Sequence, residues 1–479
     1  MLKTDKVVTR FAPSPTGFLH IGGVRTALFA YFWARKYNGT FILRIEDTDK
    51  EREVPGSIQQ IQNSLQWFGV AWDFGPDKAS PDWGSCIQSE RLDVYKKYAD
   101  ILTKKGLAYP DPYSEEEVAS FRETAMAEKR PFLFREHRPE NFDIWDGSRP
   151  LRLKVPEIKR YTWYDEVRGE LSAGEEMVDD FILIKADGYP TYNFAHIVDD
   201  LEMGVTHVMR GEEFISSLPK FLSLYDALGV TYPKFVTLPP IMGPDGKKKL
   251  SKRDGSKDAL EYDADGYLPG ALRNFLSLIG WNPGGDRELF FDEKELIEAF
   301  DLCGIQKSGG AFNEEKLKWM NKEHMEHSFT SQEKEQYVIS ALPNRDIDVV
   351  KKLVPTIFER IHNKVEIVAA DEAGEYDWAF GPITYEAELL KWKNDDSAAA
   401  AQPRLQHALQ LLQNADFSTP DTIKSLLWPY AEEIGKGELL WPLRVALTGR
   451  ERSPDPFTVA YVLGKEETLA RIQTACDKI

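Results

Sequence analysis

Residues 7–25, VVTRFAPSPTGFLHIGGVR, place a cation, a hydroxyl, a histidine and paired glycines in one short segment. We expect a buried strand at its start, a turn broken by prolines and glycine, and a helix that begins near residues 20–23. The N–H groups at the start of a helix attract phosphate, and Gly22 and Gly23 would let a ligand approach the backbone closely. The segment therefore predicts a phosphate-binding turn, although it is neither the dinucleotide fingerprint nor a Walker loop.

A carboxylate is expected beside this turn. The strand FILRI, residues 41–45, runs directly into Glu46. Because ligands of parallel α/β sheets bind at the carboxyl ends of the strands, Glu46 would lie next to the first turn and could hold the ammonium of an amino acid. The alternative for an isolated glutamate is a solvated salt-bridge partner.

Two arginines and a tyrosine suit a dicarboxylic ligand. Arg10 lies on the first strand, and Tyr192 and Arg210 lie on either side of an apolar helix-like run. A guanidinium pairs with a carboxylate at two points, and a phenol hydroxyl can add a third hydrogen bond. A neutral amide would leave a buried cation unpaired, at about 3–5 kcal/mol. From spacing alone, the alternative is that both arginines form structural ion pairs. For His196, two roles are equally open: contact with the substrate, or a hydrogen-bonded histidine of the core.

Several stretches resemble one family. The string PSPTGFLHIGG (13–23) resembles the HIGH signature of class I aminoacyl-tRNA synthetases in the form found in glutamyl-tRNA synthetases of the bacterial type. LRIEDTD (43–49) and the segment 187–213 are also similar to that family. Residues 249–253, KLSKR, resemble the KMSKS loop that closes over ATP in this class. The basic run around that loop would otherwise be interpreted as a solvated face.

The resemblance implies a glutamate–tRNA ligase. Glutamate would attack ATP, with magnesium on the phosphates, to give glutamyl-adenylate and pyrophosphate, and the 2′-hydroxyl of the tRNA end would then accept the glutamyl group. No metal-ligating residue and no zinc are expected. The residues implied to bind glutamate are Arg10, Ser14, Glu46, Tyr192 and Arg210. Those implied to bind ATP are His20, Gly22, Gly23, Glu213, Lys249 and Lys252, of which His20, Lys249 and Lys252 would be catalytic by stabilising phosphate charge.

The expected fold class is α/β plus all-α. We predict a Rossmann-like catalytic domain in two halves, an inserted subdomain that holds the acceptor end of tRNA, a helical connector and an all-helical anticodon-binding domain. The insertion has no cysteine, so the zinc knuckle of many relatives is absent. The predicted boundaries are 1–106 and 186–242 for the catalytic halves, 107–185 for the insertion, 243–322 for the loop and connector, and 323–479 for the anticodon domain. Arg444, Arg450 and Phe457 are candidate anticodon contacts or, equally, core or rim residues.

Composition limits the remaining possibilities. The 479 residues include 42% hydrophobic and 29% charged residues, which is typical of a globular protein. The net charge of −18 argues against indiscriminate nucleic-acid coating but leaves local RNA contacts open. Three scattered cysteines and a polar N-terminus predict a cytoplasmic protein, and a monomer is the family expectation. The predicted partners are tRNA-Glu, with tRNA-Gln left open, and no membrane. The alternative function is a catalytically silent or tRNA-modifying paralogue.

Overall fold

The computed structural model describes residues 6–250, 257–393 and 395–479 and divides into two compact units. The first unit comprises residues 1–264 and 268–320, and the second comprises residues 265–267 and 321–479. The predicted boundary at 322 lies two residues beyond the end of the first unit.

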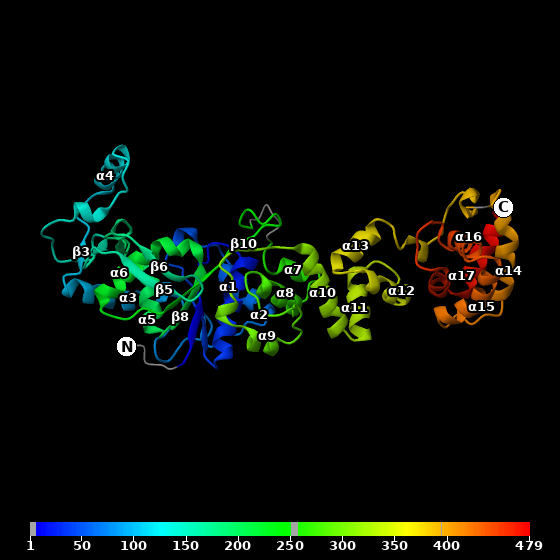
Figure 1. The fold of residues 1–479 in the computed structure, drawn as a ribbon, viewed down its shortest axis with the longest axis horizontal. Coiled ribbons are helices and arrows are strands. Elements are labelled where there is room, and N and C mark those ends of the chain that lie inside the picture. The colour runs from blue at the N-terminus through cyan, green and yellow to red at the C-terminus, as the bar shows by residue number, and fades with distance from the viewer. Residues whose placement is uncertain (1–5, 251–256, 394) are drawn as a thin grey trace. The chain divides into compact units, whose positions relative to one another are not determined.

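A six-stranded sheet forms the centre of the first unit (Figure 1). Its order is β2-β1-β8-β9-β5-β6, and every neighbouring pair is parallel except β5–β6. Three of the four central strands, β1, β8 and β9, are almost wholly buried, as expected for a parallel sheet covered on both faces. The strands are β1 (Val8–Phe11), β2 (Thr40–Leu43), β5 (Tyr161–Asp165), β6 (Gly169–Ala173), β8 (His207–Gly211) and β9 (Lys234–Leu238).

The strand order reverses between β1 and β8. From β1 the chain passes through α1 to β2 in one direction, and from β8 it passes through α6 to β9 in the other. Because both crossovers are expected to be right-handed, α1 and α6 lie on opposite faces of the sheet. A crevice opens at the carboxyl ends of strands where the order reverses, so Arg10 on β1 and Arg210 on β8 flank the expected binding position. This confirms the predicted Rossmann-like sheet.

Helix α1 is buried on nearly all sides because it lies between the sheet and the helices α8 and α9. The opposite face of the sheet is covered by α3, α5 and α6, whose apolar side chains form one core with it. The helices of this part are α1 (Ile21–Lys36), α2 (Ser57–Trp67), α3 (Leu92–Lys104), α5 (Tyr192–Glu202), α6 (Leu218–Leu228), α7 (Glu261–Ala264), α8 (Pro269–Leu278), α9 (Glu293–Ala299) and α10 (Glu314–Ser328), which continues into the second unit.

The range 107–185, predicted as one insertion, contains two different parts. Strands β5 and β6 extend the central sheet at its edge, whereas β3 (Ala108–Pro110), β4 (Leu151–Leu153) and β7 (Ile182–Ile184) form a separate three-stranded sheet with helix α4 (Glu115–Ala127) beyond it (Figure 1). In this smaller sheet the fully buried Asp180 accepts hydrogen bonds from Tyr109, Arg138 and the backbone N–H of Val155. A carboxylate therefore joins the segments of the insertion.

The second unit consists of helices in the part of it that the structure describes. This confirms the predicted helical C-terminal region, in which Thr419 is the N-cap of a helix whose first residue is Pro420. Among the residues described, no helix is long and apolar enough to cross a membrane. The helices are α11 (Ser331–Ala341), α12 (Ile347–Arg360), α13 (Lys364–Glu372), α14 (Gln402–Leu412), α15 (Pro420–Ile434), α16 (Lys436–Thr448) and α17 (Pro456–Lys478), which is kinked at Gly464.

We predict that Asp180→Ala loosens the insertion. Removing a buried carboxylate that pairs with Arg138 leaves the partner uncompensated, at about 3–5 kcal/mol, or roughly a hundredfold or larger rise in local opening. Hydrogen–deuterium exchange of β3 and β4 measures this loss of protection. The matched control is Asp143→Ala, because Asp143 pairs with Arg149 at 3.1 Å but its side chain is 83% exposed. The control should change stability by about 1 kcal/mol or less, and equal effects of the two variants would contradict the assignment.

Candidate functional site

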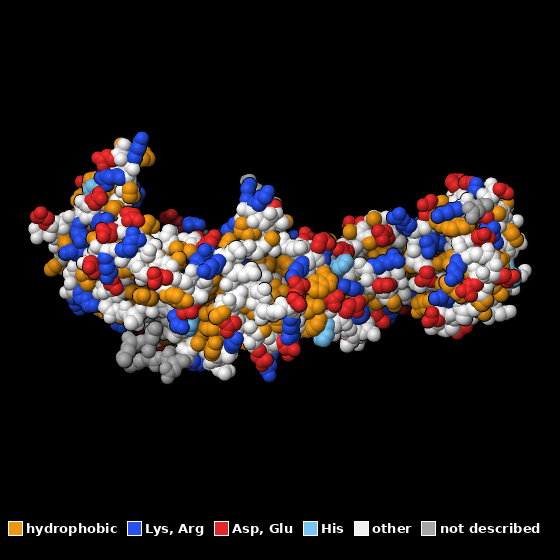
Figure 2. Space-filling model, viewed as in Figure 1, with side chains coloured by type: hydrophobic (Ala, Val, Ile, Leu, Met, Phe, Trp, Pro, Cys, Tyr) orange, Lys and Arg blue, Asp and Glu red, His pale blue; other side chains and the backbone are white. Residues whose placement is uncertain are grey.

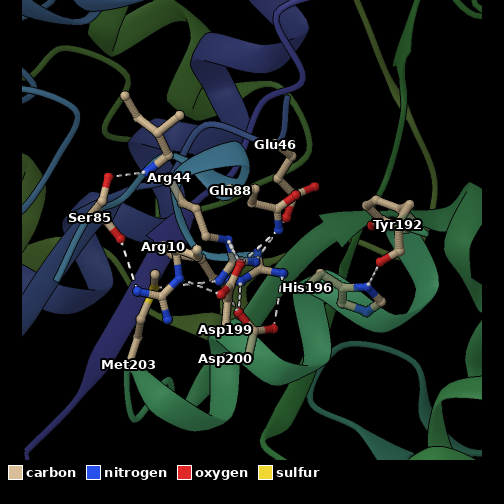
Figure 3. A network of polar contacts seen from close by, with 12 residues as sticks. Arg10, Arg44, Glu46, Ser85, Gln88, Tyr192, His196, Asp199, Asp200 and Met203 are labelled. Carbon is tan, nitrogen blue, oxygen red and sulfur yellow. Dashed lines mark hydrogen bonds and ion pairs between the residues drawn. The ribbon is translucent and has the colours of Figure 1, made fainter. Parts of the chain in front are cut away.

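The candidate site lies at the carboxyl ends of β1, β2 and β8, where α5 closes one side (Figure 3). Arg10 is the third residue of β1, Arg210 is the fourth of β8, and Glu46 follows the end of β2 by three residues. Tyr192, His196 and Asp200 recur at four-residue spacing on α5 and so share one face of that helix. Four of the five residues predicted to bind glutamate are brought together here; Ser14 is treated separately below.

Arg10 is held by a carboxylate. Its Nε and Nη2 donate to the two oxygens of Asp200 at 3.1 and 3.5 Å, and both residues are buried. Asp200 also accepts from Arg44 at 2.7 Å. Burial alone would raise the pKa of Asp200, but the two guanidinium groups outweigh burial and hold that pKa well below its usual range. Asp200 is therefore ionised and fixes Arg10 in one orientation.

Glu46 is buried beside a second guanidinium. Its Oε1 accepts from Arg44 at 2.9 Å, and its backbone N–H donates to the carbonyl of Pro13 at 3.0 Å, which ties it to the first turn. Burial raises the pKa of Glu46, while Arg44 and Arg10 oppose that rise. Ser14, next to Pro13, is exposed at this turn and makes no polar contact with the pocket residues in the described part of the chain.

Arg210 is a buried cation that pairs with no carboxylate in the described ranges of the chain. Only 9% of it is exposed, and its Nη1 has no hydrogen-bond partner among the described residues. Its guanidinium lies 5.1 Å from the ring centre of Phe214 and 4.9 Å from that of Phe221. Burial lowers the pKa of Arg210. An unpartnered buried guanidinium in a binding crevice is chemically matched to an anionic ligand group.

Tyr192 and His196 form a stacked pair next to Arg210. Their ring centres are 4.7 Å apart, and the His196 ring meets Phe221 edge-on at 4.5 Å. His196 Nδ1 lies 2.7 Å from the carbonyl of Tyr192, which can only accept, so Nδ1 carries the proton. Burial and then Arg210 lower the pKa of His196 to about 3, so the ring is neutral and Nε2 is an acceptor. Burial raises the pKa of Tyr192 to about 12, which keeps its hydroxyl protonated.

The buried charges of the site do not balance. The site contains four arginines and three carboxylates: Arg10, Arg44, Arg91 and Arg210, and Glu46, Asp199 and Asp200. None of these seven residues is more than 9% exposed. The neighbouring Asp47 does not change the charge balance, because it is paired with Lys50. The protein therefore contributes one surplus positive charge, whereas free glutamate has a net charge of −1 at neutral pH.

A cavity of about 240 Å³ adjoins the start of α1. It contains most of the residues predicted to bind ATP, together with several that the sequence did not indicate. The lining residues are His20, Gly22, Gly23, Arg25, Thr26, Gly211, Glu212, Glu213, Pro239, Pro240, Ile241, Lys249 and Leu250.

His20 is the N-cap of α1. Its Nδ1 accepts from the backbone N–H of Gly22 at 3.0 Å, so the neutral ring carries its proton on Nε2. A Cβ at residue 22 would lie 2.9 Å from the His20 ring, which explains the need for glycine there. The remaining N–H groups of the first turn and the positive end of the helix dipole make this a site for phosphate.

The predicted signature loop is tied to the cavity at both ends. Met242, in β10 (Ile241–Met242), pairs with Lys249, and Asp258 pairs with His20. Lys249 Nζ lies 4.0 Å from Glu213 Oε2, and lysine side chains gather on this loop at the surface (Figure 2). Lys252, predicted to be catalytic, lies outside the described residues.

Arg25 is the most informative residue that the sequence analysis missed. It is 4% exposed and donates to the backbone carbonyls of Ile279 and Pro239, so it joins α1 to the segment that leads into the loop. Burial lowers its pKa to about 10. Its place in the string GGVR next to the paired glycines was a usable signal, but its burial could not be read from one sequence.

A second cavity of about 630 Å³ lies in the helical unit. Arg444 and Arg450, two of the candidate anticodon contacts, line it together with Arg360 and Arg452. The third candidate, Phe457, is only 4% exposed and packs against Trp428, so it belongs to the core.

Two family profiles match consecutive parts of the chain. The profile described as "tRNA synthetases class I (E and Q), catalytic domain" matches residues 6–319. The profile described as "Anticodon binding domain" matches residues 319–476. The two matches meet within one residue of the boundary between the compact units.

Relatives and solved structures cover nearly the whole chain. A glutamate–tRNA ligase of Clostridium botulinum strain Hall is 41% identical over 99% of both chains, and one of Clostridium tetani is 37% identical over 99% of this chain and 98% of its own. The crystal structure of a glutamate tRNA ligase from Elizabethkingia meningosepticum, in complex with its amino acid, aligns with a TM-score of 0.87 at 32% identity over 99% of both chains. With this fold, this site and these relatives, the chain belongs to the glutamate–tRNA ligases of the class I tRNA synthetase family.

Proposed function

We propose that this protein activates L-glutamate with ATP and transfers it to the 3′ end of tRNA-Glu. The observation that carries the proposal is the buried guanidinium of Arg210, which has no carboxylate partner among the described residues, in the same site as the buried carboxylate of Glu46. These two groups are complementary to a carboxylate and an ammonium of one amino acid. The surplus positive charge of the site matches the charge of glutamate, whereas glutamine would leave it uncompensated, at about 3–5 kcal/mol.

In the binding step, Arg210 and Arg10 would contact the carboxylates, with Tyr192 donating a further hydrogen bond. Glu46 would accept from the ammonium, and Ser14 would contact the ligand from the exposed side of the turn. Because Asp200 and Arg44 already fix Arg10 and Glu46, little ordering is required when glutamate binds. This orientation leaves the α-carboxylate to face the cavity at the start of α1.

In the activation step, the α-carboxylate attacks the α-phosphate of ATP, which enters as its magnesium complex, and pyrophosphate leaves. His20 Nε2–H and the N–H groups at Gly22 and Gly23 would donate to phosphate oxygens. Lys249 and Lys252 would stabilise the negative charge that develops during the reaction, and Glu213, which lies 4.0 Å from Lys249, would contact ATP from the same cavity. The 2′-hydroxyl of the terminal adenosine then attacks the activated carboxyl and releases AMP.

The helical unit and the insertion would bind tRNA. The arginine-lined cavity of Arg360, Arg444, Arg450 and Arg452 suits phosphate and unstacked bases. We propose that the protein works as a cytoplasmic monomer and that these contacts decide whether tRNA-Gln is also charged. The second candidate function is that of a catalytically silent paralogue. The presence of His20, Lys249 and Arg210 together argues against it.

Replacing Arg210 by methionine should raise the KM for glutamate at least tenfold in ATP–pyrophosphate exchange measured with tRNA present. The substitution removes the surplus charge that pairs with the substrate, so the preference for glutamate over glutamine should also fall. The thermal unfolding midpoint should stay equal or rise, because an unpaired buried cation is lost. Arg35→Met is the control, since Arg35 pairs with Asp73 away from the site. An unchanged KM would remove Arg210 from the pocket.

Lys249→Ala should lower kcat for ATP–pyrophosphate exchange about tenfold to a hundredfold with little change in the KM for glutamate, because the lost charge acts on the phosphates. Lys247→Ala is the matched control: Lys247 is on the same loop and exposed, but it is not among the residues that line the cavity. If both variants lost activity equally, net loop charge rather than Lys249 would be responsible.

The decisive test of the function is aminoacylation of separate tRNA-Glu and tRNA-Gln transcripts with radiolabelled glutamate, with glutamine as the control amino acid. We expect glutamate on tRNA-Glu and no transfer of glutamine. Charging of tRNA-Gln as well would identify a non-discriminating enzyme. Absence of charging on both would support the silent-paralogue reading.

A further inference from the structure

Arg44 is a completely buried charged side chain of the site, with 0% exposure. Its Nη2 donates to Glu46 Oε1 at 2.9 Å and its Nη1 donates to Asp200 Oδ1 at 2.7 Å. The same Asp200 oxygen accepts from Arg10 Nε at 3.1 Å. One guanidinium therefore connects the expected ammonium acceptor to the arginine expected to bind a carboxylate (Figure 3).

We propose that Arg44 is a positioning residue that sets Glu46 and, through Asp200, Arg10 in a single arrangement, so that the two ends of the amino acid are recognised together. Arg44 need not touch the substrate to do this. The inference rests on the proposed function, because it takes Glu46 and Arg10 as the groups that bind glutamate.

The geometry favours an arginine. The guanidinium is planar and its nitrogens point in fixed directions, so two of them can hold two carboxylates at a fixed angle. A lysine ammonium can contact two carboxylates, but its three donors rotate on a single nitrogen, so it would not hold the carboxylates at a fixed angle. The Nε of Arg44 has no hydrogen-bond partner among the described residues, and its nearest carboxylate oxygen, on Asp199, is 3.8 Å away.

Stability alone does not account for this cluster. A group of buried ion pairs is often no more stable than well-packed apolar side chains of similar volume. Its advantage is preorganisation, since the acceptor for the substrate ammonium is already oriented before the ligand arrives. One oxygen of Glu46 is used by Arg44, and the other is the one assigned to the substrate.

Loss of Arg44 should also change how binding depends on pH. The charged and titratable groups that face Glu46 are Arg44 at the end of β2, Arg10 on β1, and Asp200 and Tyr192 on α5. Burial raises the pKa of Glu46, and Arg44 is the largest opposing influence. Without Arg44 the pKa should rise further, so that protonation at lower pH removes the ammonium acceptor.

The experiment is ATP–pyrophosphate exchange in the presence of tRNA-Glu, with the KM for glutamate and for ATP measured between pH 6 and 8.5. Arg44→Lys should raise the KM for glutamate about tenfold or more and leave the KM for ATP unchanged. Arg44→Met should raise the KM for glutamate further. In this variant the KM should fall as the pH rises, whereas in the unmodified protein the KM should not depend on pH over this range. Adding Glu46→Gln to Arg44→Met should abolish that pH dependence.

Arg152→Met is the matched control. Arg152 is 7% exposed and pairs with the buried Asp111 at 2.6 Å in the insertion, so it is a buried arginine–carboxylate pair that is not part of the site. Its loss should leave the KM for glutamate and the pH profile of that KM within about twofold. If Arg44→Met fails to fold, the comparison of Arg44→Lys with Arg152→Met tests the inference.

Two outcomes overturn the inference. One is an unchanged KM for glutamate in Arg44→Lys, and the other is an equal rise in Arg152→Met, which would make the effect one of general core damage. Glu46→Gln alone separates this inference from the proposed site. If Glu46→Gln leaves the KM unchanged, the glutamate site itself is wrong; if it raises the KM while Arg44→Lys does not, only the role of Arg44 is wrong.

Discussion

The structure of the catalytic unit depends on compensating buried charge at the carboxyl edge of its sheet. Isolated ions are expensive to remove from water, so each arginine and carboxylate must meet a partner or a ligand. Asp200 pairs with Arg10 and with Arg44, and Asp199 pairs with Arg91. Glu46 pairs with Arg44. Of Arg10, Arg44, Arg91 and Arg210, the one left without a carboxylate among the described residues is Arg210, and its position indicates where an anion is required.

The reversal of strand order explains how one crevice serves the two ligands that we propose. Helix α1 leaves β1 on one face, and its N-terminus lies at the cavity proposed for phosphate, while α5 brings Tyr192 and Asp200 against the same strand ends from the other side of the crevice. The amino-acid pocket and the nucleotide cavity are consequently neighbours, since Gly211 of the cavity directly follows Arg210. Orientation of two reactants in adjacent sites can supply a large part of the rate acceleration without a covalent intermediate.

Much of this was accessible from sequence, for identifiable reasons. The strand–turn–helix at residues 7–25, the strand before Glu46 and the helical C-terminal third follow from apolar spacing and turn residues, and the structure confirms them. That β5 and β6 join one side of the central sheet was not predicted, because short amphipathic strands do not reveal their partners. The roles of Arg25 and Arg44 were missed because a single sequence does not distinguish a buried arginine from a solvated one. Glutamate and ATP assignments for individual residues stay predictions.

The uncompensated guanidinium of Arg210 also sets a condition for inhibitors of this enzyme. A glutamate mimic that fills the pocket must bring a net negative charge, because a neutral compound of the same shape would leave the cation desolvated and unpaired. Anionic molecules pass poorly through lipid bilayers, since charge is costly to place in hydrocarbon. In compounds directed at this crevice, the negative charge that increases affinity therefore also hinders entry into the cell. A neutral precursor that is converted to the acid inside the cell would satisfy both requirements.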